Sequence, residues 1–337
     1  MGPPSSEITC GTLPTMALPE RLGRLQQVER LGVGGFATVW LYHDEELQSD
    51  VAVKALAENW AQRLDVRERF LEEARILRRA DSDHIVRVYD VGEADGTPYF
   101  VMTYADLGSL GDVLERDSLP PLATAVDMVR QAGAGLSVLH EHGVVHRDIK
   151  PQNLLVRSGG SAGDRILVAD LGVAKALLHA SGLTQVVGTP SYMAPEQATG
   201  IGVDVRADVH ALAAVTYQLL TGRLVRTGTL GELMHATLPP APSTLVDLPT
   251  AVDDVLLRAL EPDPEDRWPD VASYVAALRA AVPAPAGAQE QLTLWQLPDR
   301  PREVVPASRG TTWTTALISL LAFVAAFGVA YVITTLV

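Results

Sequence analysis

The chain has 337 residues, of which 47% are hydrophobic, so it can form one large or two modest domains with sizeable cores. Its formal net charge of −14 argues against a general nucleic-acid-binding protein, because contacts to phosphates require Lys and Arg. The single cysteine, Cys10, excludes an internal disulfide framework and is typical of a reducing compartment.

The first structured segment is expected to begin near residue 25. Residues 1–24 are predicted to be a disordered tail, because residues 1–19 contain four prolines and no sustained periodicity. Met1 and Met16 both remain candidates for the start of translation.

Residues 25–56 predict three strands with a glycine-rich turn, GVGGFA at 32–37, between the first two. Glycines let backbone N–H groups approach phosphate oxygens closely, and an ordinary hairpin is the alternative interpretation. A strand follows the turn, and no Gly-Lys-Ser/Thr occurs in it, so it is neither a Rossmann nor a P-loop motif.

A lysine and a glutamate stand out in the next two elements. Lys54 lies in an apolar alternating strand, and it is one of only three lysines among 27 basic residues. Glu73 lies in the apolar stripe of a helix predicted over residues 60–80. A buried glutamate requires a cationic partner, whereas a glutamate at the edge of the stripe would simply be solvated.

Residues 85–89 and 99–104 predict two more strands, which complete a small α+β unit of five strands and one helix. After Gly108 the pattern becomes helical. An apolar face over residues 125–139 predicts a helix that ends at Gly143.

The segment 146–153, HRDIKPQN, concentrates chemically useful side chains. Asp148 could accept a proton, Lys150 could neutralise a transferring phosphoryl group, and Asn153 could hold a metal ion. Two short strands, 154–156 and 166–169, follow. Asp170 ends the second strand in the triplet Asp-Leu-Gly and is a candidate ligand of Mg²⁺, although such triplets are also common turns.

Residues 173–192 are polar and lack periodicity, which predicts a mobile surface segment containing Ser181, Thr184 and Thr189. The triplet Ala-Pro-Glu ending at Glu196 closes this segment. A helix over 206–222 is apolar nearly all round and should be buried, and Asp208 near its start is either a helix-terminus carboxylate or a buried acceptor for backbone N–H groups. Two further helices are predicted over 250–260 and 269–281.

The C-terminal part predicts a membrane anchor. Residues 283–312 form a Pro/Ala-rich juxtamembrane linker, and residues 313–337 a transmembrane helix. The apolar run 317–337 would be about 32 Å long, against a hydrocarbon core of ~30 Å. The positive-inside rule places the bulk of the chain in the cytoplasm and the C-terminus at or just beyond the outer face of the plasma (inner) membrane, so that no extracellular sensor domain is expected. The arginines that set this orientation are Arg300, Arg302 and Arg309.

Taken together, these motifs resemble the Hanks-type serine/threonine protein kinases of bacteria. The resemblance covers residues 25–282 and implies an α+β bilobal fold, with a five-stranded sheet and helix C in an N-lobe (25–105) and a mainly helical C-lobe (106–282). The bias toward Arg suggests a high-GC genome. Further family motifs fall on Glu196, Asp208 and Arg267, to which the resemblance gives structural roles.

The resemblance implies phosphoryl transfer from ATP to protein Ser or Thr hydroxyls, with Mg²⁺ or Mn²⁺ as the metal. Lys54, held by Glu73, would position the phosphates. Asn153 and Asp170 would bind the metal, Asp148 would act as the base, and Lys150 would stabilise the transferred group. The ATP-binding residues implied are Leu31, Gly32, Val33, Gly34, Gly35, Phe36, Val39, Ala52, Lys54, Met102 and Tyr104.

Regulation is also implied. Arg147 beside Asp148 suggests that autophosphorylation of Thr184, Ser181 or Thr189 orders the activation loop, with homodimers allowing phosphorylation between copies. The sequence departs from the family pattern at Ala37, Leu171 and Thr103, none of which is a reacting group. A nucleotide-binding pseudokinase scaffold and a membrane adaptor are the alternatives.

Overall fold

The computed structural model describes residues 18–116, 118–160, 163–172, 190–200, 202–227 and 237–282. The expected linker, the transmembrane helix and the three candidate phosphorylation sites, Ser181, Thr184 and Thr189, lie outside these residues. Among the residues that are described, no helix has the length and apolar character needed to cross a bilayer.

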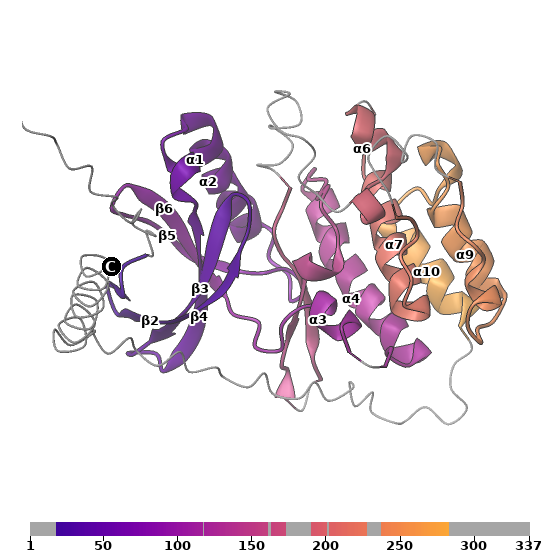
Figure 1. Ribbon diagram of the computed structural model, residues 1–337, viewed down its shortest axis with the longest axis horizontal. Helices are drawn as coiled ribbons and strands as arrows, with labels where there is room; N and C mark the ends of the chain where they lie inside the picture. The colour runs from indigo at the N-terminus through magenta and orange to yellow at the C-terminus, as the bar shows by residue number, and fades with distance from the viewer. Residues whose placement is uncertain are drawn as a thin grey trace, which may run out of the picture. The chain divides into compact units, whose positions relative to one another are not determined.

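The N-terminal part of the described chain is an antiparallel sheet in the order β1-β2-β3-β4-β6-β5 (Figure 1). Its strands are β1 (Arg21–Leu22), β2 (Leu25–Val33), β3 (Ala37–Asp44), β4 (Ser49–Leu56), β5 (Val88–Ala94) and β6 (Thr97–Thr103). The glycine-rich segment 34–36 joins β2 to β3. In the strand pairing, Lys54 of β4 lies opposite Val39 of β3 and Phe100 of β6.

Two boundaries differ from the predictions. Residues 18–24 were expected in the disordered tail, but they contain a sixth strand, β1, and the buried Leu18. They are also held by the Tyr42 hydroxyl, which donates to the Pro19 carbonyl at 2.8 Å. The strand expected at 85–89 instead begins at Val88. Residues 84–86 pair with Val168 of β8, so this stretch joins the sheet to the C-terminal part before it enters β5.

Helices α1 (Glu58–Ala61) and α2 (Leu64–Arg79) lie beside one another against the sheet (Figure 1). The face of α2 that is buried carries Val66, Phe70, Glu73, Ala74 and Leu77, at the helical spacing seen in the sequence. Phe70 packs on Phe100 of β6, with ring centroids 5.0 Å apart. This contact fixes the rotation of α2 and directs Glu73 toward the sheet.

The C-terminal part is mainly helical and is built around α7, which is buried nearly all round as its composition predicts. It also contains the β7-β8 hairpin and short 3₁₀ turns. The longer elements are α3 (Leu110–Leu114), α4 (Leu122–Glu141), β7 (Leu154–Arg157), β8 (Arg165–Val168), α6 (Pro195–Thr199), α7 (Arg206–Thr221), α9 (Ala251–Ala259) and α10 (Val271–Ala281). Gly143, which follows α4, has φ +72, as expected for the residue after a helix end.

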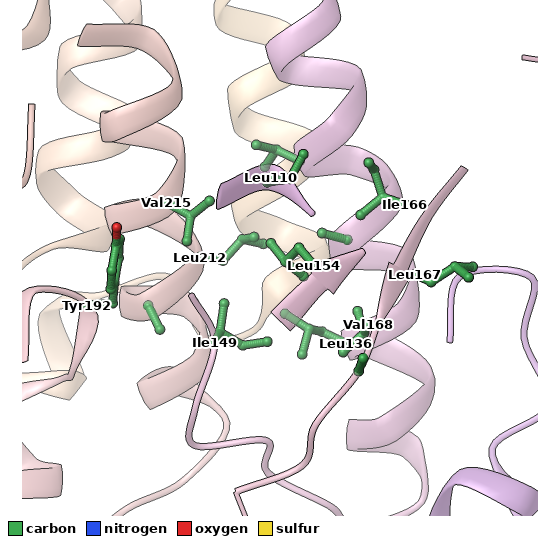
Figure 2. Close-up of a cluster of buried hydrophobic side chains, with 14 of the residues drawn as sticks. Leu110, Leu136, Ile149, Leu154, Ile166, Leu167, Val168, Tyr192, Leu212 and Val215 are labelled. Atoms are coloured by element: carbon green, nitrogen blue, oxygen red, sulfur yellow. The ribbon is translucent and has the colours of Figure 1, made fainter. Parts of the chain in front are cut away.

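A continuous apolar cluster lies beneath the segment 146–153. Ile149, in the middle of that segment, belongs to the same buried cluster as Leu154 of β7 and Leu212 and Val215 of α7 (Figure 2). The polar residues on either side of Ile149 are thus carried on a backbone that is anchored by burial of an apolar side chain.

Burial of an unprotonated histidine in α7 predicts a loss of stability in acid. His210 is fully buried, and burial together with the charges of Arg226 and Arg267 holds its pKa well below the usual value. Below pH ~6.5 the unfolded chain takes up a proton at this position that the folded chain does not bind, so stability falls as the pH falls. The expected slope is about 1.4 kcal/mol per pH unit.

Urea denaturation followed by tryptophan fluorescence between pH 7 and pH 5 measures this slope. His210→Gln should make the slope shallower by about one proton. His142→Gln, at the exposed end of α4, should leave it unchanged. Equal slopes in wild type and His210→Gln would contradict the prediction.

Candidate active site

A cleft of about 710 Å³ lies between the sheet and the helical part, and it is lined from both. The glycine-rich segment and β4 contribute from one side, and the segment 146–153 and Asp170 contribute from the other. Every residue predicted to bind ATP, from Leu31 to Tyr104, lines this cleft. The predicted catalytic residues Glu73, Asp148 and Lys150, and the predicted metal ligands Asn153 and Asp170, line it as well.

Lys54 connects three elements at the inner end of the cleft. Its Nζ donates to Glu73 Oε1 at 2.7 Å and to Asp170 Oδ1 at 2.9 Å, and it lies 5.6 Å from the centroid of the Phe100 ring. Burial alone would lower the pKa of Lys54, but the charges of Asp170 and Glu73 outweigh burial and raise it. The side chain is therefore charged in the folded chain.

The segment 146–153 is held from below by Asp208 of α7. Asp208 is fully buried, and its Oδ2 accepts from His146 N at 2.7 Å and from His140 Nε2 at 2.8 Å, while its Oδ1 accepts from Arg147 N at 2.9 Å. This arrangement decides between the two roles left open for Asp208: it is a buried acceptor of backbone N–H groups. It also stabilises Arg147 in a left-handed conformation, with φ +65.

Asp148 is oriented by its neighbours in the same segment. Asn153 Nδ2 donates to Asp148 Oδ2 at 2.8 Å and to its backbone carbonyl at 2.7 Å, and Lys150 Nζ lies 3.5 Å from Oδ2. Since the amide of Asn153 is used as the donor, its oxygen faces away from Asp148 and is oriented to accept. The carboxylate, the ammonium and the carboxamide predicted from the sequence are thus in contact.

The strand end that carries Asp170 is positioned by His146. The ring Nε2 donates to the Ala169 carbonyl at 3.0 Å, and Nδ1 accepts from Asp148 N at 3.3 Å, so the ring is neutral. Burial lowers the pKa of His146, which agrees with this pattern. Asp170 has φ +59, and Gly172 lies so close to the His146 carbonyl that a Cβ would approach it to 2.9 Å. Glycine is therefore required at position 172.

The remaining predicted structural residues form a second buried ion pair. Arg267 donates through Nη1 and Nη2 to the two carboxylate oxygens of Glu196, at 2.7 and 2.8 Å. Its guanidinium also donates to the carbonyls of Arg206, Glu261 and Pro262. The pair fastens α6, which carries Glu196, to the segment that precedes α10.

Some lining residues were not predicted. Leu155 faces the cleft from β7, and Ser109, Asp112 and Gln152 line its rim. Ser109 and Asp112 form a capping box at the start of α3, a pattern that is visible in the sequence as Ser-Leu-Gly-Asp after Gly108. The contact of His140 with Asp208 had no signal in the sequence, because it depends on how α4 packs on α7.

Comparisons with known proteins agree with this geometry. The protein kinase domain family matches residues 25–271. The chain is 38% identical over 273 residues to the serine/threonine-protein kinase Pkn1 of Myxococcus xanthus, and 35% identical over 276 residues to PknB of Mycobacterium leprae. Each alignment covers 78% of this chain, but only 39% and 44% of those proteins, so the chain spans about two fifths of their length.

Among solved structures, the crystal structure of the Mycobacterium tuberculosis PknI kinase domain superposes with a TM-score of 0.63 at 28% identity. That superposition covers 79% of this chain and all of the PknI domain. The chain belongs to the protein kinase family, and the bilobal fold expected from its sequence is confirmed.

The buried carboxylate of Asp208 generates a testable prediction. Both of its oxygens accept from N–H groups, so the amide of Asp208→Asn would face a donor in either orientation. We expect a loss of about 2 kcal/mol in the free energy of unfolding, and a matching disturbance of the segment 146–153. Thermal denaturation measures the first effect, and initial rates with ATP measure the second.

Asp204→Asn is the matched control, since Asp204 is exposed and its carboxylate accepts from the Arg206 N–H at 2.8 Å and lies 3.9 Å from the Arg206 guanidinium, at the start of the same helix. That substitution should change stability by less than about 0.5 kcal/mol. Indistinguishable melting temperatures for the two variants would refute the anchoring role of Asp208.

Proposed function

We propose that the chain is a serine/threonine protein kinase that transfers the γ-phosphoryl group of ATP to hydroxyl groups of proteins. The observation that carries the proposal is the contact of Lys54 with both Glu73 and Asp170, in a cleft that also holds Asp148. This arrangement brings a phosphate-binding cation, a metal-binding carboxylate and a base together. A pseudokinase or an adaptor would have no need to keep all of them.

The residues of the chain have distinct parts in this reaction. Lys54 holds the α- and β-phosphates of ATP through its ammonium group, and Glu73 keeps that group in place. Asp148 orients the acceptor hydroxyl and accepts its proton. The hydrogen bond from Asn153 fixes the orientation of the Asp148 carboxylate. Lys150 lies beside Asp148 and stabilises the charge of the transferred group.

A divalent metal fits the donor set at the cleft. Asp170 and Asn153 present a carboxylate and a carboxamide, which are hard oxygen ligands. Mg²⁺ in phosphate-transfer sites is held by one or two such ligands together with phosphate oxygens, so few protein ligands suffice. When bound, Mg²⁺ or Mn²⁺ would neutralise charge on the phosphate oxygens.

The choice of Ser and Thr as acceptors is supported by Lys150, which stands two residues after Asp148 as in the serine/threonine branch of the family. The curated relatives bear the same assignment in their names. We further infer autophosphorylation of the segment 173–192, at Thr184, Ser181 or Thr189, with Arg147 as the contact for the added phosphate.

Replacing the proposed base tests the function. The full chain, purified in detergent, should incorporate phosphate from labelled ATP with Mg²⁺, and Asp148→Asn should lower the rate by about 10²- to 10⁴-fold. Asp254→Asn, on the exposed face of α9, is the control and should retain the wild-type rate. Equal incorporation by wild type and Asp148→Asn would refute the kinase assignment.

Analysis of the labelled product refines the result. The label should be found on Ser and Thr, with Thr184, Ser181 and Thr189 as the expected positions, and label on Tyr alone would contradict the proposed acceptor. When the Asp148→Asn chain is mixed with wild type, label on the variant shows transfer between copies, as a homodimer would allow.

We also propose that the kinase is tethered to the inner face of a membrane. The support is the apolar run 317–337 and the arginines at 300, 302 and 309. After expression in a bacterial host, the full chain should stay in the membrane pellet through an alkaline carbonate wash. A chain that ends at residue 312 should be released, and release of both would refute the tether.

A further inference from the structure

The tip of the glycine-rich segment contacts a side chain outside the cleft, Trp60 of α1. The Nε1 of Trp60 donates to the Gly35 carbonyl at 2.9 Å. Its ring packs on that of Phe36, with centroids 5.1 Å apart and an angle of 43° between the planes. Gly35 and Phe36 line the cleft, whereas Trp60 does not. A ring outside the cleft thus holds two residues that face it.

The contact with Gly35 also sets the direction of a backbone donor. The Gly35 carbonyl and the Phe36 N–H belong to one trans peptide, so they point in opposite directions. Because Trp60 holds the carbonyl, the Phe36 N–H is turned away from Trp60. Within the described residues this N–H makes no hydrogen bond, while the Phe36 carbonyl accepts from Ala57 N at 2.8 Å. An N–H of a glycine-rich turn in this state is a donor for a phosphate oxygen.

Trp60 also contacts Arg63, the residue that precedes α2. The guanidinium carbon of Arg63 lies 5.8 Å from the centroid of the Trp60 ring, and Arg63 pairs with Asp65 in the first turn of α2, at 2.7 Å. The Arg63 N–H donates to the Trp60 carbonyl at 3.0 Å. The Trp60 ring thus contacts the residue at the start of α2 (Figure 1), and α2 is the helix that carries Glu73.

We propose that Trp60 is a positioning residue for nucleotide binding. It holds the Gly35 carbonyl so that the Phe36 N–H remains available to the phosphates, and it joins the glycine-rich segment to the helix whose Glu73 holds Lys54. The two phosphate-binding parts of the sheet side are thereby kept in one arrangement. This inference rests on the proposed function in one respect, namely that the cleft takes ATP.

Binding of ADP with Mg²⁺ to the purified full chain, measured by calorimetry, tests the role of Trp60 without requiring turnover. Trp60→Phe keeps an aromatic ring beside Phe36 but removes the donor to Gly35. We expect the dissociation constant of Mg-ADP to rise about two- to tenfold, the range for one neutral hydrogen bond. The KM for ATP should rise by a similar factor, while the KM for a peptide substrate should not change.

Trp40→Phe is the matched control. Trp40 lies on β3 and packs against a separate apolar cluster, beside Arg30, away from the cleft lining. Its substitution should leave ADP affinity at the wild-type value. Equal affinities of wild type and Trp60→Phe, or equal weakening by Trp60→Phe and Trp40→Phe, would overturn the proposal.

Failure of the phosphate-incorporation assay would leave the ADP measurement interpretable, and equal ADP affinities would leave the kinase assignment intact.

Discussion

The structure of the cleft depends on a single ammonium group. Lys54 contacts both Glu73 on the sheet side and Asp170 just after β8, so its two ion pairs join the two halves of the described chain. Of the two, only the pair with Glu73 is buried on both sides, and removing one partner of a buried pair costs about 3–5 kcal/mol. The orientation of α2, which carries Glu73, and the position of Asp170 thus meet at the same ammonium group.

Two residues of the cleft have strained backbone conformations, and buried hydrogen bonds stabilise the backbone beside them. Arg147 and Asp170 both adopt left-handed conformations, which are unfavourable for residues other than glycine, at a cost of about 1–3 kcal/mol each. Asp208 binds the N–H groups of residues 146 and 147, and the ring of His146 binds the carbonyl of residue 169. These strained positions lie next to Asp148 and at Asp170, the two carboxylates that line the same cleft.

The sequence predicted those features that follow from local pattern or from the need of a buried charge. A glutamate in an apolar stripe suggested a need for a cation, and the family resemblance named Lys54 as that partner of Glu73. The late start of β5 could not be predicted, because it results from pairing with β8, some eighty residues further on. The contact of Trp60 with Gly35 could not be predicted for a similar reason, because it depends on where the short helix α1 packs.

The ion pairs made by Lys54 and by Arg267 differ in their exposure to the cleft. Arg267 is buried, and its guanidinium binds both oxygens of Glu196 and three backbone carbonyls. Lys54 has a compact ammonium with three rotatable donors, and its partner Asp170 keeps a side chain that is 45% exposed at the cleft. A phosphate oxygen can therefore share the ammonium of Lys54, whereas it could not enter the Arg267 pair. Lysine stands at this position in a chain whose basic residues are otherwise almost all arginine.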